Sequence, residues 1–177
     1  MTAAEVYESV TNGGASDLAG LVSFPNQNAA WCLVGEFALN CYVEPLYTVE
    51  VDVVADARWI ETSGLDAESF APSAPLIWDR ARRARSTTSM LQVNLVVDPR
   101  YQSFIPTAKQ RNIFGEEVPV ATLEDVLQGK VWAWQDSKRR LSKRKKDELD
   151  LLRIAEAYPQ MRHLIPMEIV SELGNQR

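Results

Sequence analysis

The chain has few of the residues that build zinc sites and disulfides. It contains 177 residues but only one histidine and two cysteines, and Cys32 and Cys41 do not have the CxxC spacing of a metal or redox motif. Together with His163 they do not supply the four ligands of a typical zinc site. We therefore expect both thiols to be small buried apolar groups.

Long apolar runs are also missing. No stretch of about 18 apolar residues occurs, and the N-terminal segment has no basic stretch followed by an apolar one. This pattern predicts neither a membrane span nor a leader, and we expect a cytoplasmic protein with no membrane partner. The apolar fraction of 46% and the charged fraction of 24% are typical of a folded globular domain.

The charge is unevenly distributed along the chain. A net charge of -5 gives no general attraction to nucleic acid, yet seven of the nine residues in Lys138–Lys146 are basic. One interpretation is a solvated loop and helix start. The other is a surface where Lys143, Arg144 and Lys145 bind RNA phosphates. A second basic cluster, Arg80–Arg85, either extends that surface or pairs with acids elsewhere.

Hydrophobic periodicity predicts that all strands lie in the first two thirds of the chain and that the last third is helical. The apolar run 31–34, which ends at Gly35, and the alternating segments 48–54 and 91–97 predict strands, of which the last two are expected to pair. A short extended segment is expected at 118–121. Helices are expected at 3–10, 16–22, 36–43, 56–62, 101–110, 143–157 and 167–173, and in a segment that begins at Thr122. Residues 66–89 give no clear prediction.

These elements predict an α/β (α+β) fold. We expect a small mixed sheet flanked by helices, with a C-terminal helical portion. Residues 1–121 would form the α/β core with its N-terminal helices, and residues 122–177 the helical region. A chain of 177 residues suits one compact unit of this kind.

Two carboxylates in the valine-rich strand are the main candidates for chemistry. Glu50 and Asp52 are two residues apart, so their side chains project from the same face of a strand. Neighbouring carboxylates repel each other unless a cation lies between them, and Mg²⁺ prefers oxygen ligands. The alternative is the solvated face of an amphipathic strand. At Gly35, a strand-to-helix turn offers backbone N–H groups to a phosphate.

Four segments, in this order, resemble motifs of minimal nucleotidyltransferases of the AbiEii-type toxin group. Gly35–Asn40 resembles the glycine turn and Ala-Leu helix, and Tyr47–Asp52 resembles the threonine and Asp-x-Asp strand. Ala121–Lys130 is similar to the helix that follows the sheet. Lys146–Asp150 is similar to a Lys-Asp-x-x-Asp element. The resemblance covers roughly residues 30 to 155.

The resemblance implies a nucleotidyltransferase fold and a magnesium-dependent reaction. A nucleoside monophosphate would pass from a nucleoside triphosphate to RNA or protein. As the toxin of a toxin–antitoxin system, the chain would also have an antitoxin protein as partner. The resemblance places catalysis at Glu50, Asp52, Asn94 and Lys130, Mg²⁺ at Glu50 and Asp52, and nucleotide binding at Gly35, Glu36, Lys146 and Asp150.

Three positions depart from the pattern of the group. Glu36 replaces a small residue of the turn, Glu50 replaces an aspartate, and Asn94 stands where a third carboxylate is usual. An amide neither adds negative charge nor deprotonates a nucleophile. One alternative is therefore a catalytically inactive module of the same fold that binds a nucleotide or a partner. Another is a transferase that acts on a small molecule such as an aminoglycoside.

Some site residues also have a simple structural interpretation. Lys130 lies within the apolar stripe of its predicted helix, where a lysine can lay its stem on the core and extend its amino group outward. Lys146 and Asp150 are four residues apart, the spacing of an ion pair on a helix surface.

Overall fold

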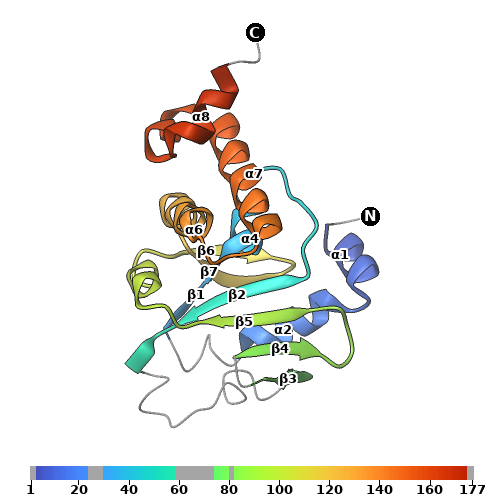
Figure 1. Cartoon of the computed structure of the whole chain (residues 1–177). Helices are drawn as coiled ribbons and strands as arrows, with labels where there is room; N and C mark the ends of the chain where they lie inside the picture. The colour runs from blue at the N-terminus through green and yellow to red at the C-terminus, as the bar shows by residue number, and fades with distance from the viewer. Residues whose placement is uncertain (1–2, 24–29, 59–73, 80–81, 175–177) are drawn as a thin grey trace.

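A seven-stranded mixed sheet forms the centre of the protein, in the order β3-β4-β5-β2-β1-β7-β6 (Figure 1). The computed structural model describes residues 3–58 except 24–29, and residues 74–174 except 80–81. The strands are β1 (Trp31–Val34), β2 (Glu50–Ala55), β3 (Leu76–Trp78), β4 (Arg83–Ser86), β5 (Gln92–Val96), β6 (Lys109–Ile113) and β7 (Glu116–Val120).

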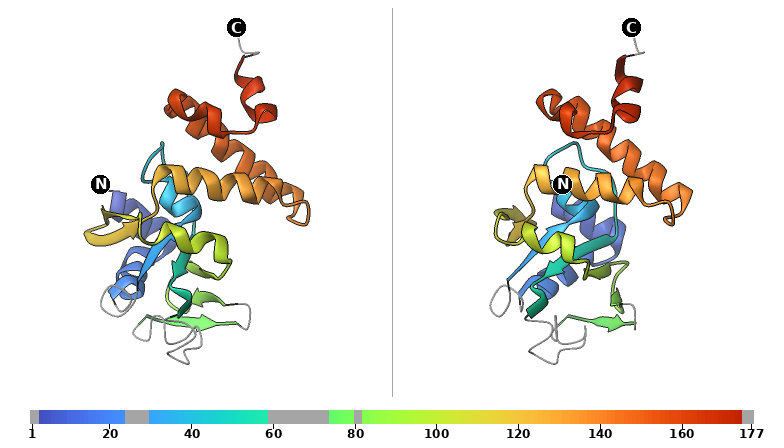
Figure 2. Two further views of the ribbon diagram at one scale, coloured as in Figure 1. Left: turned by 90° about the vertical axis from the view of Figure 1, so that its left-hand side faces the viewer. Right: turned by 60° about the vertical axis from the view of Figure 1, so that its left-hand side comes forward.

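Helices flank the sheet and extend the molecule beyond it. The α-helices are α1 (Ala3–Thr11), α2 (Gly14–Ser23), α4 (Gly35–Leu39), α6 (Leu123–Gln135), α7 (Leu141–Ala157) and α8 (Met167–Gly174), and the 3-10 helices are η2 (Pro99–Phe104) and η3 (Pro159–Leu164). Figures 1 and 2 show α7, η3 and α8 at the end of the molecule opposite β3 and β4. Helices α6 and α7 pack against each other. None of the helices in the described part of the chain is long and apolar enough to span a bilayer.

The pairing at the centre of the sheet places the predicted acids. Strand β2 pairs with β5 in parallel, with Asp52 opposite Asn94, and antiparallel with β1. Because side chains alternate along a strand, Val51 and Val53 enter the core, while Glu50 and Asp52 face the other side. The predicted pairing of segments 48–54 and 91–97 is confirmed.

The helix predicted at 101–110 is wrong. A 3-10 helix ends at Phe104, and Pro106, which has no N–H group, precedes strand β6. Strand β6 lies at the sheet edge, and its first four residues are exposed, so it lacks the apolar alternation that identifies a strand. It pairs with β7 through a turn in which Phe114 and Gly115 have positive φ angles.

Residues 66–89, which gave no prediction, contribute the antiparallel pair β3 and β4 to the sheet. The part from 66 to 73 lies outside the described residues. So do residues 59–62 of the helix predicted at 56–62. The helix predicted to begin at Thr122 is confirmed, since the Thr122 hydroxyl accepts a hydrogen bond from Asp125 N at 3.2 Å.

Both thiols are shielded from solvent to different degrees. Cys32 is buried in β1, and desolvation raises the pKa of its thiol to about 12. Cys41 is half-buried, and burial also raises its pKa. The prediction of a small buried apolar group is confirmed for Cys32, whereas Cys41 is only partly buried against the core.

Candidate active site

A pocket of about 260 Å³ lies between the sheet and the helices α6 and α7. Strands β1, β2 and β5 meet at its floor, and the turn into α4 closes one side. The residues that line it are Val34, Gly35, Glu50, Asp52, Asn94, Val96, Tyr101, Phe104, Asp125, Val126, Gly129, Lys130, Ala133, Arg139, Lys143 and Asp147. The structure therefore brings Gly35 to the same pocket as Glu50, Asp52, Asn94 and Lys130.

The carboxylate of Asp52 lies directly over the Gly35 turn. Gly35 has a φ of +69°, and a Cβ atom at this position would lie 2.1 Å from Asp52 Oδ2. Only glycine both adopts this backbone conformation at low cost and leaves room for the carboxylate. No side chain therefore separates Asp52 from the backbone of the strand-to-helix turn.

The surroundings of Asp52 disfavour its charge in the absence of a cation. Burial raises its pKa, and the neighbouring Glu50 acts in the same direction. A hydrogen bond from Asn94 Nδ2 to Asp52 Oδ1, 2.8 Å long, and the charge of Lys130 oppose the rise without cancelling it. Asn94 thus orients Asp52 without adding a negative charge.

Replacing Gly35 by alanine is expected to displace Asp52. The new methyl group would push the carboxylate away from Asn94, and the positive φ angle would add backbone strain. The expected cost is about 1–3 kcal/mol of unfolding free energy, measured by urea denaturation. Gly115→Ala is the matched control, because Gly115 has a φ of +98° but no atom within 4 Å of the added Cβ. Equal unfolding free energies for the two variants would contradict the close contact between Gly35 and Asp52.

Glu50 shares the face of β2 with Asp52 and is held by a lysine. Both of its carboxylate oxygens accept hydrogen bonds of 3.0 Å from Lys143 Nζ. The two side chains are 37% and 33% exposed, so water screens the ion pair and it stabilises the fold weakly. A cation can therefore replace Lys143 at Glu50 at small cost.

The donor set of the pocket fits one Mg²⁺ ion. Glu50 and Asp52 provide two carboxylates, and Mg²⁺ in proteins is commonly bound by one or two carboxylates together with substrate phosphates. Within the described part of the chain, no group of three or more His, Cys, Asp or Glu side chains forms a metal site. The chemistry of these ligands favours a single ion that is completed by a bound nucleotide.

Lys130 lines the pocket, but its amino group is paired with three acidic side chains. Its Nζ atom donates to Asp150 Oδ2 at 2.6 Å and lies 3.5 Å from Glu36 Oε2 and 3.6 Å from Asp147 Oδ1. Burial lowers the pKa of Lys130, but Asp150 and Glu36 outweigh it, so the pKa is raised and the amine stays charged. Its charge is therefore largely neutralised by carboxylates at the interface between α6 and α7.

The side chain of Glu36 points into the same interface and does not line the pocket. Its Oε1 atom accepts a hydrogen bond from Arg153 Nη1 at 3.0 Å, and Arg153 also donates to Asp150 Oδ1 at 2.8 Å. Burial raises the pKa of Glu36, but a hydrogen bond from Asp150 and the nearby cations outweigh it and lower the pKa. We call the set Glu36, Lys130, Asp147, Asp150 and Arg153 the ion-pair network.

Three residues predicted to bind the nucleotide therefore lie beside the pocket. The side chains of Glu36, Lys146 and Asp150 are not among its lining residues. Asp150 is completely buried in the ion-pair network, and Lys146 lies 3.7 Å from Glu36. A Lys-Asp-x-x-Asp element at this position thus ties α7 to α4 and α6.

The basic run is partly occupied by internal contacts. Lys143 faces the pocket through Glu50, Arg144 donates to the Trp134 carbonyl oxygen at 2.8 Å, and Lys145 pairs with Glu148 at 2.7 Å. These contacts leave fewer free cations than the sequence suggests for an RNA surface. The predicted RNA contact by these residues stays a prediction.

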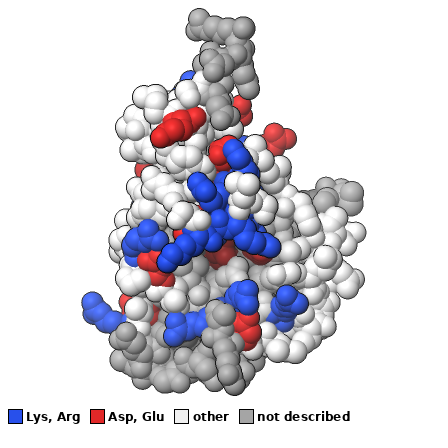
Figure 3. Space-filling view, viewed as in Figure 1, with Lys and Arg blue, Asp and Glu red and all other residues white. Residues whose placement is uncertain are grey.

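Arg139 is a pocket residue that the sequence patterns do not predict. Arg139 lines the pocket and donates from Nε to Asp147 Oδ2 at 2.8 Å. Its place within the basic run was a signal, but nothing local distinguished it from its neighbours. Figure 3 shows Lys and Arg side chains in a band across this face, with acidic atoms in the hollow beneath them.

The mixed sheet with its flanking helices is similar to that of a nucleotidyltransferase-like structure. No family model matches the chain, and no curated protein sequence matches it. Among solved structures, it is similar to an antigenic nucleotidyltransferase-like protein from Paracoccidioides brasiliensis, with a TM-score of 0.52 and 19% identity over 85% of this chain and 75% of that one. This similarity confirms the predicted fold class.

A second solved structure is less similar. The antibiotic-resistance factor ANT(2'')-Ia has a TM-score of 0.45 and 11% identity, with coverage of 84% of this chain and 94% of that one. The narrower resemblance to AbiEii-type toxins stays a prediction.

Proposed function

We propose that the chain is a magnesium-dependent nucleotidyltransferase that moves a nucleoside monophosphate from a nucleoside triphosphate to RNA or protein. The observation that supports it most is the contact between Asp52 and the Gly35 turn, where a Cβ atom would lie 2.1 Å from the carboxylate. Gly35 and Asp52 both line the pocket, so a metal-binding acid and the backbone of the turn would face a polyphosphate bound there.

The residues of the pocket would have different roles in such a reaction. Glu50 and Asp52 would hold Mg²⁺, and Asn94 keeps Asp52 in place. When bound, Mg²⁺ neutralises phosphate charge and aligns the reacting groups. Arg139 and Lys143 add positive charge at the rim, where pyrophosphate leaves.

This reaction forms one bond and breaks one bond at the α-phosphorus. The acceptor hydroxyl oxygen bonds to the α-phosphorus, and the bond from that phosphorus to the bridging oxygen of pyrophosphate breaks. The hydroxyl proton passes to Asp52 or to water.

The presence of Asn94 favours a second candidate function. Without a third carboxylate, the same pocket suits a module that binds a nucleotide or a partner protein and does not catalyse transfer. A toxin role, with an antitoxin partner, is part of the first proposal and is based on the sequence resemblance alone.

Transfer of a labelled nucleotide tests the proposal. The protein is incubated with Mg²⁺, each labelled nucleoside triphosphate in turn, and total RNA or cell extract. We expect label to appear on RNA or protein with at least one nucleotide, and to disappear when a chelator removes Mg²⁺. Nucleotide binding without transfer would support the inactive nucleotide-binding module, and neither binding nor transfer would contradict both the transferase and that module.

A further inference from the structure

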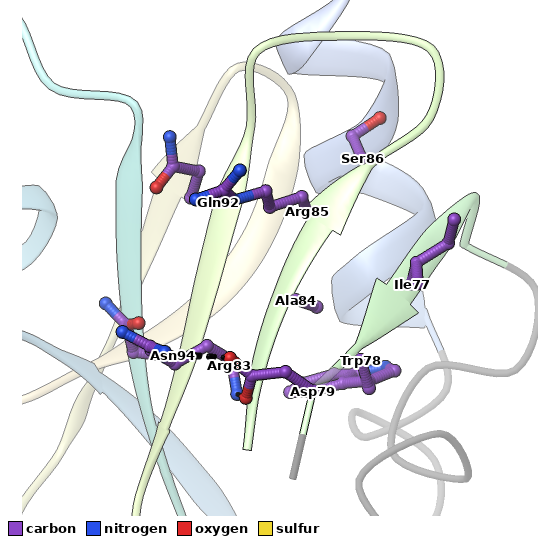
Figure 4. A pocket seen from close by; sticks show the side chains of 9 residues that line it. All are labelled: Ile77, Trp78, Asp79, Arg83, Ala84, Arg85, Ser86, Gln92 and Asn94. Carbon is purple, nitrogen blue, oxygen red and sulfur yellow. Dashed lines mark hydrogen bonds and ion pairs between the residues drawn. The ribbon is translucent and has the colours of Figure 1, made fainter. Parts of the chain in front are cut away.

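A second pocket, of about 380 Å³, adjoins the active-site pocket. Strands β3, β4 and β5 form it, and Asn94 lines both pockets. Figure 4 shows the side chains of Arg83 and Arg85 extending from β4 across β5, Arg83 beside Asn94 and Arg85 toward Gln92. The two pockets therefore adjoin on this face of the sheet and share Asn94.

Strand register fixes the distance between the arginines and the acids. Neighbouring strands are about 4.8 Å apart, so the backbone of β4 lies roughly 10 Å from that of β2, with β5 between them. One row across the sheet runs Arg83, Asn94, Asp52, and the next runs Arg85, Gln92, Glu50. Each arginine thus faces one acid of the pair across a single amide side chain.

The charge of this second pocket is only partly compensated. Arg83 donates to Asp79 Oδ2 from Nη2 at 2.9 Å and from Nε at 3.1 Å, but the two side chains are 65% and 45% exposed, so water screens the pair and it is open to exchange. In the part of the chain that the structure describes, no group accepts a hydrogen bond from the exposed guanidinium of Arg85. A guanidinium binds phosphate oxygens in pairs, and the Gln92 amide adds a further donor.

We propose that this second pocket binds the acceptor of the transfer reaction, and that the acceptor carries a phosphate group close to its reactive hydroxyl. The proposal rests on the proposed function. With the phosphate at Arg83 and Arg85, the rest of the acceptor spans β5 and presents its hydroxyl at Asp52. The end of an RNA strand and a free nucleotide share this chemistry, whereas an unmodified protein acceptor lacks it.

Binding measurements test the pocket separately from transfer. The probe is a short fluorescein-labelled single-stranded RNA, followed by anisotropy without nucleoside triphosphate, and AMP is the competitor. For Arg83→Gln combined with Arg85→Gln we expect the probe Kd to rise about tenfold or more, since charge-assisted hydrogen bonds are lost. Arg82→Gln is the matched control, because Arg82 is exposed next to β4 and does not line the pocket.

The outcomes separate this proposal from the proposed function. An unchanged Kd in the double variant, or an equal rise in Arg82→Gln, would overturn the arginine pocket even if transfer occurs. Transfer to protein alone would overturn it as well. If wild-type protein binds the probe through the arginines but transfers no label, the transferase and the acceptor role both fail. Displacement of the probe by AMP supports a free nucleotide, and its absence supports an RNA end.

Discussion

Replacing Asp52 by asparagine is expected to slow nucleotide transfer by about a thousandfold or more. A metal-bound charge stabilises the transition state by several kcal/mol, and each 1.4 kcal/mol corresponds to about a factor of ten in rate. The amide keeps an oxygen for Asn94 but loses the negative charge that, in the proposed mechanism, would hold Mg²⁺ next to Gly35. The measurement is the initial rate of label transfer at saturating Mg²⁺ and nucleoside triphosphate.

The Asp52→Asn variant is expected to fold as well as the wild type. Burial raises the pKa of Asp52, so the folded state binds its proton more readily than the unfolded state does. At neutral pH the charge therefore costs stability, and removing it does not lower the free energy of unfolding. Glu124→Gln, which removes an exposed carboxylate of α6 outside the pocket, is the matched control. A rate close to the wild-type rate in Asp52→Asn would exclude Asp52 from the chemistry.

The parts of the site that follow from local patterns were predictable. The alternation around Glu50 and Asp52, and the glycine after a buried apolar run, depend on a few neighbouring residues. Such signals identify the strand, its exposed face and the turn without knowledge of the fold. The pairing of β2 with β5 followed from the same alternation in the segment that contains Asn94.

The remaining features depend on contacts between segments far apart in sequence. Nothing near Glu36 indicates that Arg153, 117 residues away, accommodates its charge. Strand β3 is an apolar run of only three residues, too short to identify a strand, and β4 carries two exposed arginines on either side of Ala84. Their place in the sheet depends on the pairing of β4 with β5 and of β3 with β4.

The ion-pair network explains how Glu36 replaces a small residue in the turn. A carboxylate next to a triphosphate would repel it, but the Glu36 side chain points away from the pocket and is only 4% exposed. Lys130 and Arg153 balance its charge from two different helices. The network thus links the turn that positions Asp52 to the C-terminal helices.

Replacing Lys130 by methionine is expected to lower the free energy of unfolding by about 3–5 kcal/mol. Lys130 is 8% exposed, and its loss leaves Asp150 buried with less compensating charge. Urea denaturation measures the effect. Lys143→Met is the matched control, and we expect it to cost less than about 1 kcal/mol because its pair with Glu50 is solvated. Equal midpoints for Lys130→Met and the wild type would refute the structural role of Lys130.

The pH dependence of Lys130→Met provides an independent check. Burial raises the pKa of Asp150 to about 6, and Lys130 opposes that rise, so the pKa increases further when Lys130 is removed. As the pH falls from about 8 to about 5, the folded variant takes up a proton on Asp150 that the unfolded chain does not bind. The stability deficit of the variant should therefore shrink toward low pH. A further exchange of Asp150 for leucine should restore stability at neutral pH, since it removes the buried charge that Lys130 compensates.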